Sequence, residues 1–252
     1  MIHAKPANLT IPESTRPFAD AVSLEISSDD GMFHGNVDHY LSCGASALNV
    51  ITSIVQLAGI GAPERILDFG AGAGRVTRWL RAAFPAASIE ACDIREGDVA
   101  FCRERLGVRA WRSGVEIETL QAPNTYDLIW VGSVLTHLSA DDAVRITRRW
   151  LEWTNPGGLV IATTHGRTAV EFAETGFLTY IEPERWACVM EDYRTTGYGY
   201  ADYAHVRGYG ISLTAPSWIA RFVESWPGVR LVALGERAWD GHQDVVALQK
   251  LR

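Results

Sequence analysis

Short apolar runs alternate with amphipathic segments along most of this chain. The runs have the length of buried strands and occur at residues 65–69, 88–93, 108–111, 126–131 and 159–164. The segments between them have apolar residues three or four positions apart, which is the spacing of one helix face. Strands that alternate with helices in this way predict an α/β fold, in which helices cover both faces of a mostly parallel sheet.

The C-terminal part departs from strict alternation. A helix at 216–225 leads to two strands, 229–234 and 245–248, whose link is too short for a parallel crossover. We therefore expect these last two strands to pair antiparallel. Residues 165 to about 210 are rich in Gly and Tyr and have no place in the alternation, so we interpret them as an inserted lid.

The N-terminal residues 1 to about 30 contain Pro, Ser and Asp without sustained periodicity, which predicts a loosely structured arm. A helix at 40–57 follows, and Gly59 provides its stop. We expect residues 1–60 to form this arm and helix. Residues 61–252 are long enough to form one core domain that carries the insert.

Composition and charge narrow the classes of function. Lys and Arg total 23 against 30 Asp and Glu, and the net charge of −7 has the wrong sign for strong attraction to nucleic acid. The sequence contains no run of about eighteen apolar residues, so it predicts no membrane span. The start of the chain lacks the features of an export signal, which predicts a cytoplasmic protein. The 4 cysteines show neither metal-ligand spacing nor the density of a disulfide scaffold.

A glycine-rich turn follows the first core strand and precedes a helix expected at 75–84. Its sequence is Asp68-Phe69-Gly70-Ala71-Gly72-Ala73-Gly74. Gly70, Gly72 and Gly74 tolerate positive φ and let the backbone approach a ligand without a Cβ in the way. The free amides at the start of the helix would face an anionic group of that ligand. A dinucleotide fingerprint instead places its third glycine one position later, where this chain has Arg75.

Two carboxylates accompany this turn. Asp68 lies in the strand, where a carboxylate is costly unless it orders the turn or meets an ammonium group of the ligand. Asp93 ends the next strand about twenty residues later, where an acid can accept hydrogen bonds from both ribose hydroxyls. Each acid could merely cap a strand end. Together with the turn, they predict a nucleoside site at the carboxyl edge of the sheet.

These residues resemble a known family. The span from Arg65 to Leu80, RILDFGAGAGRVTRWL, is similar to motif I of class I S-adenosylmethionine-dependent methyltransferases, and Asp93 matches their acid after the second strand. Tyr126 to Ile129 followed by Ser133 to Leu138 is similar to the fourth motif of a bacterial subgroup that acts on small molecules and glycans. The resemblance implies a Rossmann-like seven-stranded sheet, mostly parallel with an antiparallel last strand, and S-adenosyl-L-methionine as cofactor.

The resemblance also assigns residues to cofactor binding, namely Asp68, Gly70, Gly72, Gly74, Asp93 and Ser133. Many members carry an acid for the adenine amino group after the third strand. This chain has Trp111-Arg112-Ser113-Gly114 there, so Ser113 and the backbone of Gly114 and Val115 are the candidates. Tyr40 lies on the helix that closes over the cofactor in similar enzymes, and we expect it to reach the cofactor's carboxylate. Ordinary helix packing is the alternative.

Three histidines are candidates for the chemistry. Methyl transfer to an alcohol needs positioning and usually a base, and imidazole titrates near neutral pH. His137 follows the fourth core strand, at the edge expected to hold the cofactor, and His165 directly follows the fifth. Either could instead fix a loop or cap a strand. His242, between the last two strands, is oriented by a carboxylate or belongs to a polar turn. No compact ligand spacing supports a metal site, so we assign no metal ligand.

The insert is rich in aromatic residues, which suit stacking on sugars or flat rings or else form the insert's own core or a dimer contact. They are Tyr180, Trp186, Tyr193, Tyr198, Tyr200, Tyr203 and Tyr209. Together with the candidate base His137, the resemblance implies O-methylation of a small-molecule or saccharide hydroxyl, and a homodimer stays open. The alternatives are an NAD(P)-dependent oxidoreductase on a similar sheet and a cofactor-binding protein without catalysis.

Overall fold

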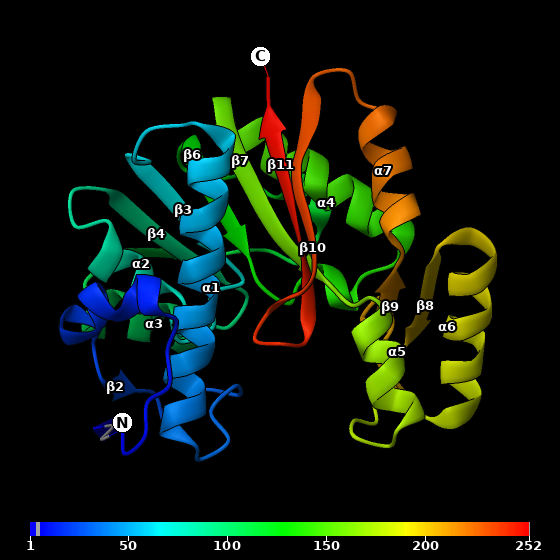
Figure 1. The fold of residues 1–252 in the computed structure, drawn as a ribbon, viewed down its shortest axis with the longest axis horizontal. Helices are drawn as coiled ribbons and strands as arrows, with labels where there is room; N and C mark the ends of the chain where they lie inside the picture. The colour runs from blue at the N-terminus through cyan, green and yellow to red at the C-terminus, as the bar shows by residue number, and fades with distance from the viewer. Residues whose placement is uncertain (4–5, 252) are drawn as a thin grey trace. The chain divides into compact units, whose positions relative to one another are not determined.

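The computed structural model describes residues 1–3 and 6–251. The strands of its large sheet span Arg65–Phe69 (β3), Ser88–Asp93 (β4), Arg109–Arg112 (β5), Tyr126–Val131 (β6), Thr154–Thr164 (β7), Val229–Trp239 (β10) and Gln243–Lys250 (β11). They form one sheet in the order β10-β11-β7-β6-β3-β4-β5 (Figure 1). β3, β4 and β5 pair parallel, whereas β11 is antiparallel to both β7 and β10. The predicted α/β class and the antiparallel C-terminal pair are confirmed.

The chain packs as two compact units, Met1–Trp130 and Val131–Arg252. In the first unit, α1 (Val37–Ala58) begins three residues before the predicted helix because the Asn36 side chain accepts a hydrogen bond from the His39 amide. A Cβ on Gly44 would lie 2.4 Å from the Arg75 carbonyl oxygen, so glycine is needed where α1 approaches the glycine turn. The sequence predicts no membrane span, yet α1 is long and apolar enough to cross a membrane by length and composition alone, and half of its apolar window is buried inside the protein.

The arm before α1 is folded, and the prediction of a loosely structured arm is wrong. β1 (Ile2–His3) pairs antiparallel with β2 (Glu25–Ile26), and a 3-10 helix, η1, spans Glu13–Ala21. Val22 and Ile26 are buried in a cluster with side chains of α1 and α2 (Thr77–Ala83). The apolar residues of the arm follow no helix or strand period because separate short turns bring each of them to this cluster.

The rest of the first unit follows the predicted alternation with shifted boundaries. α2 starts two residues later than predicted because the glycine turn extends to Val76. α3 (Glu96–Arg105) follows β4, and a short 3-10 helix, η2 (Ile117–Thr119), follows β5.

In the second unit, a 3-10 turn, η3 (Leu135–His137), precedes α4 (Ala140–Trp153). The Ser139 side chain accepts a hydrogen bond from the Asp142 amide, which is the helix cap that the sequence predicts. β7 begins at Thr154, five residues earlier than predicted, and takes in the turn-like sequence that ends at Gly158. α7 (Pro216–Glu224) precedes β10.

The insert folds into a small layer of its own between β7 and α7. It contains α5 (Arg167–Glu174), α6 (Pro183–Thr196) and an antiparallel hairpin of β8 (Tyr198–Asp202) and β9 (Gly210–Thr214), which lie together in Figure 1. Its buried core is formed by Ala169, Ile181, Val189, Met190, Ile211 and Leu213, against which Tyr180, Trp186, Tyr193 and Tyr203 pack. These four aromatic residues therefore serve the insert's own core. The Thr214 amide donates to the His165 carbonyl oxygen at 2.8 Å, so the insert leaves and rejoins the core at one point.

Candidate functional site

The glycine turn adopts the backbone that its sequence predicts. Gly70, Gly72 and Gly74 have φ values of 71°, 53° and 78°, in the left-handed region that favours glycine. The amides of Gly70 and Ala71 both donate to the Cys92 carbonyl oxygen, at 2.9 and 3.0 Å, which ties the turn to β4. A Cβ at position 72 would meet no atom within 4 Å, so the backbone there faces open space. The turn thus has the conformation and the room to receive a ligand.

Asp68 orders the turn through α2. Its side chain is 2% exposed, and Oδ2 accepts a hydrogen bond from Thr77 Oγ1 at 2.6 Å. Burial is the main reason why the pKa of Asp68 rises to about 7, while the Thr77 hydrogen bond opposes that rise. The bond fixes the start of α2 against the end of β3.

Asp93 lies beside the turn with acceptor capacity to spare. Its Oδ2 accepts from the Gly72 amide at 2.9 Å, and its Oδ1 accepts from the Arg95 amide at 3.0 Å. A carboxylate has about four acceptor sites, so each oxygen of this half-buried side chain can accept another hydrogen bond. These residues could hold a nucleoside whose ribose hydroxyls donate to Asp93.

The other cofactor candidates of the first unit are placed less directly. The Ser113 amide donates to the Asp93 carbonyl oxygen at 2.9 Å, which brings Ser113 and exposed Gly114 to the same strand edge. Tyr40 is buried in α1, and its hydroxyl donates to Asp30 Oδ2 at 2.6 Å. In this structure the Tyr40 hydroxyl therefore takes part in the packing of α1, which is the alternative given above. A contact between Tyr40 and the cofactor stays a prediction.

In the second unit, Ser133 is held in a closed ring of hydrogen bonds. Its amide donates to Thr163 Oγ1 at 2.8 Å, and that hydroxyl donates to Gln243 Oε1 at 2.6 Å. The Gln243 amide group in turn donates to Ser133 Oγ at 2.8 Å. This ring holds Ser133 at a φ of 58°, which is uncommon for a residue other than glycine. It thereby fixes the turn that leads to His137.

His137 is oriented by the insert. Its Nδ1 lies 2.8 Å from the Gly210 carbonyl oxygen and 3.2 Å from the Tyr203 hydroxyl. A carbonyl oxygen only accepts, so Nδ1 carries the proton and Nε2 the free lone pair. The Tyr209 ring stacks on the imidazole with centroids 4.7 Å apart. Burial lowers the pKa of His137, with the Gly210 contact opposing, so the ring is neutral at pH 7 and can accept a proton through Nε2.

His165 is the more deeply buried histidine, with 4% of its surface exposed. Burial, and then the nearby His242 and His137 rings, lower its pKa to about 3. One ring nitrogen bonds to the backbone of Ser212, and within the described chain Nδ1 has no hydrogen-bond partner. A ring that resists protonation so strongly is a poor general base, so the structure favours the alternative in which His165 fixes the end of β7.

His242 stacks on His165 with ring centroids 5.1 Å apart. Its Nε2 lies 2.7 Å from the Tyr180 hydroxyl, so a tyrosine from the insert holds the ring. Both alternatives expected from the sequence have support, since the His242 amide donates to the Trp239 carbonyl oxygen in a turn and the charge of Asp240 opposes the lowering of the His242 pKa by burial. The structure thus brings His137, His165 and His242 near one another, each touched by a residue of the insert or its hairpin. Among residues 1–3 and 6–251, no group of three or more His, Cys, Asp or Glu side chains is arranged to hold a metal ion.

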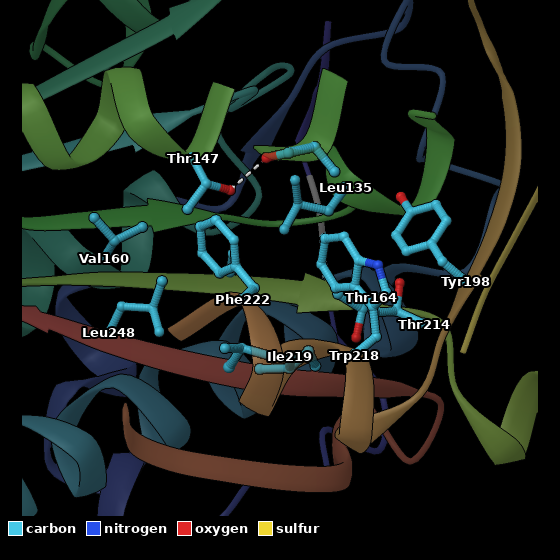
Figure 2. A pocket seen from close by; sticks show the side chains of 13 residues that line it. Leu135, Thr147, Val160, Thr164, Tyr198, Thr214, Trp218, Ile219, Phe222 and Leu248 are labelled. Atoms are coloured by element: carbon cyan, nitrogen blue, oxygen red, sulfur yellow. Dashed lines mark hydrogen bonds between the residues drawn. The ribbon is translucent and has the colours of Figure 1, made fainter. Parts of the chain in front are cut away.

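A cavity of about 30 Å³ lies in the second unit between α4, α7 and the strands β7 and β11 (Figure 2). It is lined mainly by apolar side chains, and Thr164 and Tyr198 border it (Figure 2). A water molecule needs about 10–15 Å³ of such space, whereas sites for small organic ligands are commonly about 300 Å³ or larger. The cavity therefore has room for one or two waters and is too small for a methyl acceptor.

Sequence reasoning missed the residues that position His137. Gly210 contacts it from 73 positions away in the chain, and Gln243 reaches Ser133 across 110 positions. Neither contact can be predicted from a local pattern in the sequence. The only hint was position, since Gln243 follows His242 in a polar turn and Gly210 ends the aromatic insert.

Comparisons with known proteins show a similarity to methyltransferases. A family profile described as a methyltransferase domain matches residues 66–158. A malonyl-[acyl-carrier protein] O-methyltransferase of Bacillus anthracis is 32% identical over 114 residues, covering 45% of this chain and 42% of that protein. A phosphoethanolamine N-methyltransferase of Plasmodium falciparum is 24% identical over 161 residues, covering 62% and 59%. The chain thus spans about half the length of these curated relatives.

Solved structures share the fold. The plantazolicin methyltransferase BpumL, in complex with SAH and a substrate analogue, has a TM-score of 0.56 at 15% identity, covering 85% of this chain and 84% of that one. An S-adenosylmethionine-dependent methyltransferase from Clostridium acetobutylicum also has a TM-score of 0.56, at 11% identity, covering 81% and 91%. With the family match, these confirm the expected resemblance and the Rossmann-like fold. Both solved proteins are methyltransferases and the family profile describes a methyltransferase domain, which is the class of protein that the sequence resemblance predicts.

Proposed function

We propose, from the premise that residues 66–158 form a methyltransferase domain of the class I fold, that this chain transfers a methyl group from S-adenosylmethionine to a hydroxyl of a small molecule or saccharide. The observation that carries the proposal is the glycine turn with Asp93 bound to the Gly72 amide. The family match favours this transferase over the alternative of a nicotinamide-dependent oxidoreductase.

In this proposal, the first unit binds the cofactor. The turn of Gly70, Gly72 and Gly74 receives its amino-acid part, and Asp93 accepts hydrogen bonds from the ribose hydroxyls. Ser113 and the backbone of Gly114 border the adenine. Bound S-adenosylmethionine supplies a methyl group on a positively charged sulfur, which an oxygen nucleophile can attack in line.

His137 is the proposed general base. Its Nε2 takes the proton of the acceptor hydroxyl as the oxygen forms its bond to the methyl group. Two observations support this role: the Gly210 carbonyl fixes the tautomer with Nε2 free, and burial keeps the ring neutral. His137 lies six residues after the end of β6. Six extended residues span about 20 Å at most, so the His137 backbone lies within that distance of the carboxyl end of β6.

The insert is the proposed acceptor lid, since its hairpin supplies the residues around His137. Tyr209 is 46% exposed while its ring stacks on His137, so the exposed part of its surface is available to an acceptor. We place the protein in the cytoplasm, where its free cysteines stay reduced.

Calorimetric titration with S-adenosylhomocysteine (SAH) tests the cofactor site. Saturable binding is expected for the wild-type protein, and Asp93→Ala should weaken it about tenfold or more because two charge-assisted hydrogen bonds to the ribose are lost. Asp20→Ala, an exposed acid on η1, is the matched control and should bind as the wild type does. Absence of wild-type binding at millimolar SAH would contradict the proposal. Turnover with a panel of hydroxyl acceptors separates an enzyme from a cofactor-binding protein without catalysis.

A further inference from the structure

A buried arginine joins the glycine turn to the N-terminal arm. Arg78 of α2 is 1% exposed, so its guanidinium depends on protein oxygens for its hydrogen bonds. Arginine has five N–H donors. Each finds an acceptor within the first unit: Gly74 O at 2.9 Å, Ala73 O at 3.2 Å, Ser23 O at 2.9 Å, Glu25 O at 2.6 Å and the Tyr40 hydroxyl at 3.5 Å.

These acceptors fall into two groups far apart in sequence. Ala73 and Gly74 end the glycine turn, whereas Ser23 and Glu25 flank and begin β2 in the arm, more than fifty positions away. One rigid, planar group therefore sets the distance between the arm and the turn. A lysine would keep the charge but could not present five donors in one plane.

The charge of Arg78 is balanced through the arm as well. Burial lowers the pKa of Arg78, and contact with Tyr40 and the nearby Asp30 opposes that change. The Tyr40 hydroxyl, which accepts from Arg78, donates to Asp30 at 2.6 Å. The buried cation is thus linked to a carboxylate of the arm through one hydroxyl, so undocking the arm would remove its counter-charge.

A second arginine, Arg95, also binds this segment of the arm. Arg95 Nη2 donates to the Asp29 carbonyl oxygen at 2.9 Å, while its own amide donates to Asp93 at 3.0 Å. The arm between Ser23 and Asp30 is therefore tied both to the glycine turn and to the residue beside the proposed ribose acid.

We infer that Arg78 is a positioning residue that couples docking of the N-terminal arm to cofactor binding. The inference rests on the proposed cofactor site. A cofactor that orders the glycine turn holds the carbonyls of Ala73 and Gly74 in place, which favours Arg78 in its docked position and the arm against it. The coupling is reciprocal, so a docked arm raises the affinity for the cofactor.

The test combines SAH titration with hydrogen exchange of the backbone amides of residues 22–31. In the wild type, saturating SAH should slow exchange in this segment about tenfold. Arg78→Met should raise the Kd for SAH about tenfold and abolish the slowing. Arg78→Lys should behave like Arg78→Met, because the charge alone does not bridge arm and turn. Arg81→Met is the control, since Arg81 lies on the same helix but donates to the Leu106 carbonyl oxygen.

The outcomes separate this inference from the proposed function. No SAH binding by the wild type contradicts the cofactor site itself. Wild-type binding without any change of exchange in residues 22–31 overturns the coupling, even if no Arg78 variant folds. Equal losses of affinity in Arg78→Met and Arg81→Met also overturn it, because they would reflect general destabilisation of α2.

Discussion

His137→Ala lowers kcat by about a hundredfold or more and leaves the Kd for SAH nearly unchanged, if Nε2 accepts the acceptor's proton. The alanine removes the proposed base and leaves the residues of the glycine turn unchanged. For the wild type, kcat/KM should rise with pH through a pKa below 6.5 and then level off, because burial lowers the pKa of His137 and only the neutral ring accepts a proton. Steady-state kinetics between pH 5 and 8 would show this limb and its loss in the variant.

His205→Ala is the matched control for that experiment. His205 lies in the connection between β8 and β9, as do Tyr203 and Tyr209, and its side chain is exposed. Its removal should leave kcat within about twofold of the wild type. A His137→Ala enzyme with wild-type kcat would demote His137 to a structural role and leave positioning alone to drive the reaction.

His165→Phe stabilises the protein progressively as the pH falls. In the unfolded chain this histidine binds a proton below about pH 6.5, whereas burial delays protonation in the folded state to about pH 3. Between these values the unfolded state binds more protons, so the neutral ring's contribution is complete above pH 6.5 and is lost as the pH falls towards 3. The difference in unfolding free energy between variant and wild type should change by about 1.4 kcal/mol per pH unit.

The difference in unfolding free energy between His165→Phe and the wild type is the quantity to measure, because Asp68 gives the wild-type stability the opposite pH dependence. Its pKa rises to about 7 in the folded state, so the folded state holds the extra proton there and stability falls as the pH rises towards 7. The two groups partly cancel in the wild type. Denaturant unfolding of His165→Phe and Asp68→Asn at several pH values should give differences of opposite slope. A flat difference for His165→Phe would mean that the ring protonates freely in the folded state.

The sequence predicted those parts of the fold that rest on local patterns. Each core strand was predicted from a short apolar run, and a strand is present at each of these positions in the structure. The helix cap at Ser139 was predictable because it involves the amide of a residue only three positions away. The glycine turn was predictable because positive φ restricts residue choice at Gly70, Gly72 and Gly74.

The remaining features depend on contacts between distant residues. The arm was misjudged because its apolar side chains reach α1 and α2 through irregular turns. Arg78 reads in the sequence as an ordinary helix-surface cation, and only the folded arm shows that it is buried. The orientation of His137 depends on the Gly210 carbonyl, a backbone group that residue identity does not encode.

The hydrogen bond between the Thr214 amide and the His165 carbonyl has an evolutionary consequence. A segment whose two ends meet at one backbone contact can be exchanged for a shorter or longer one while the strand and helix that flank it keep their places. If the insert is the acceptor lid, as proposed, exchange of the whole module between β7 and α7 would change the acceptor and leave the proposed cofactor site unaltered. For protein engineering, the same junction marks where a foreign insert can be grafted.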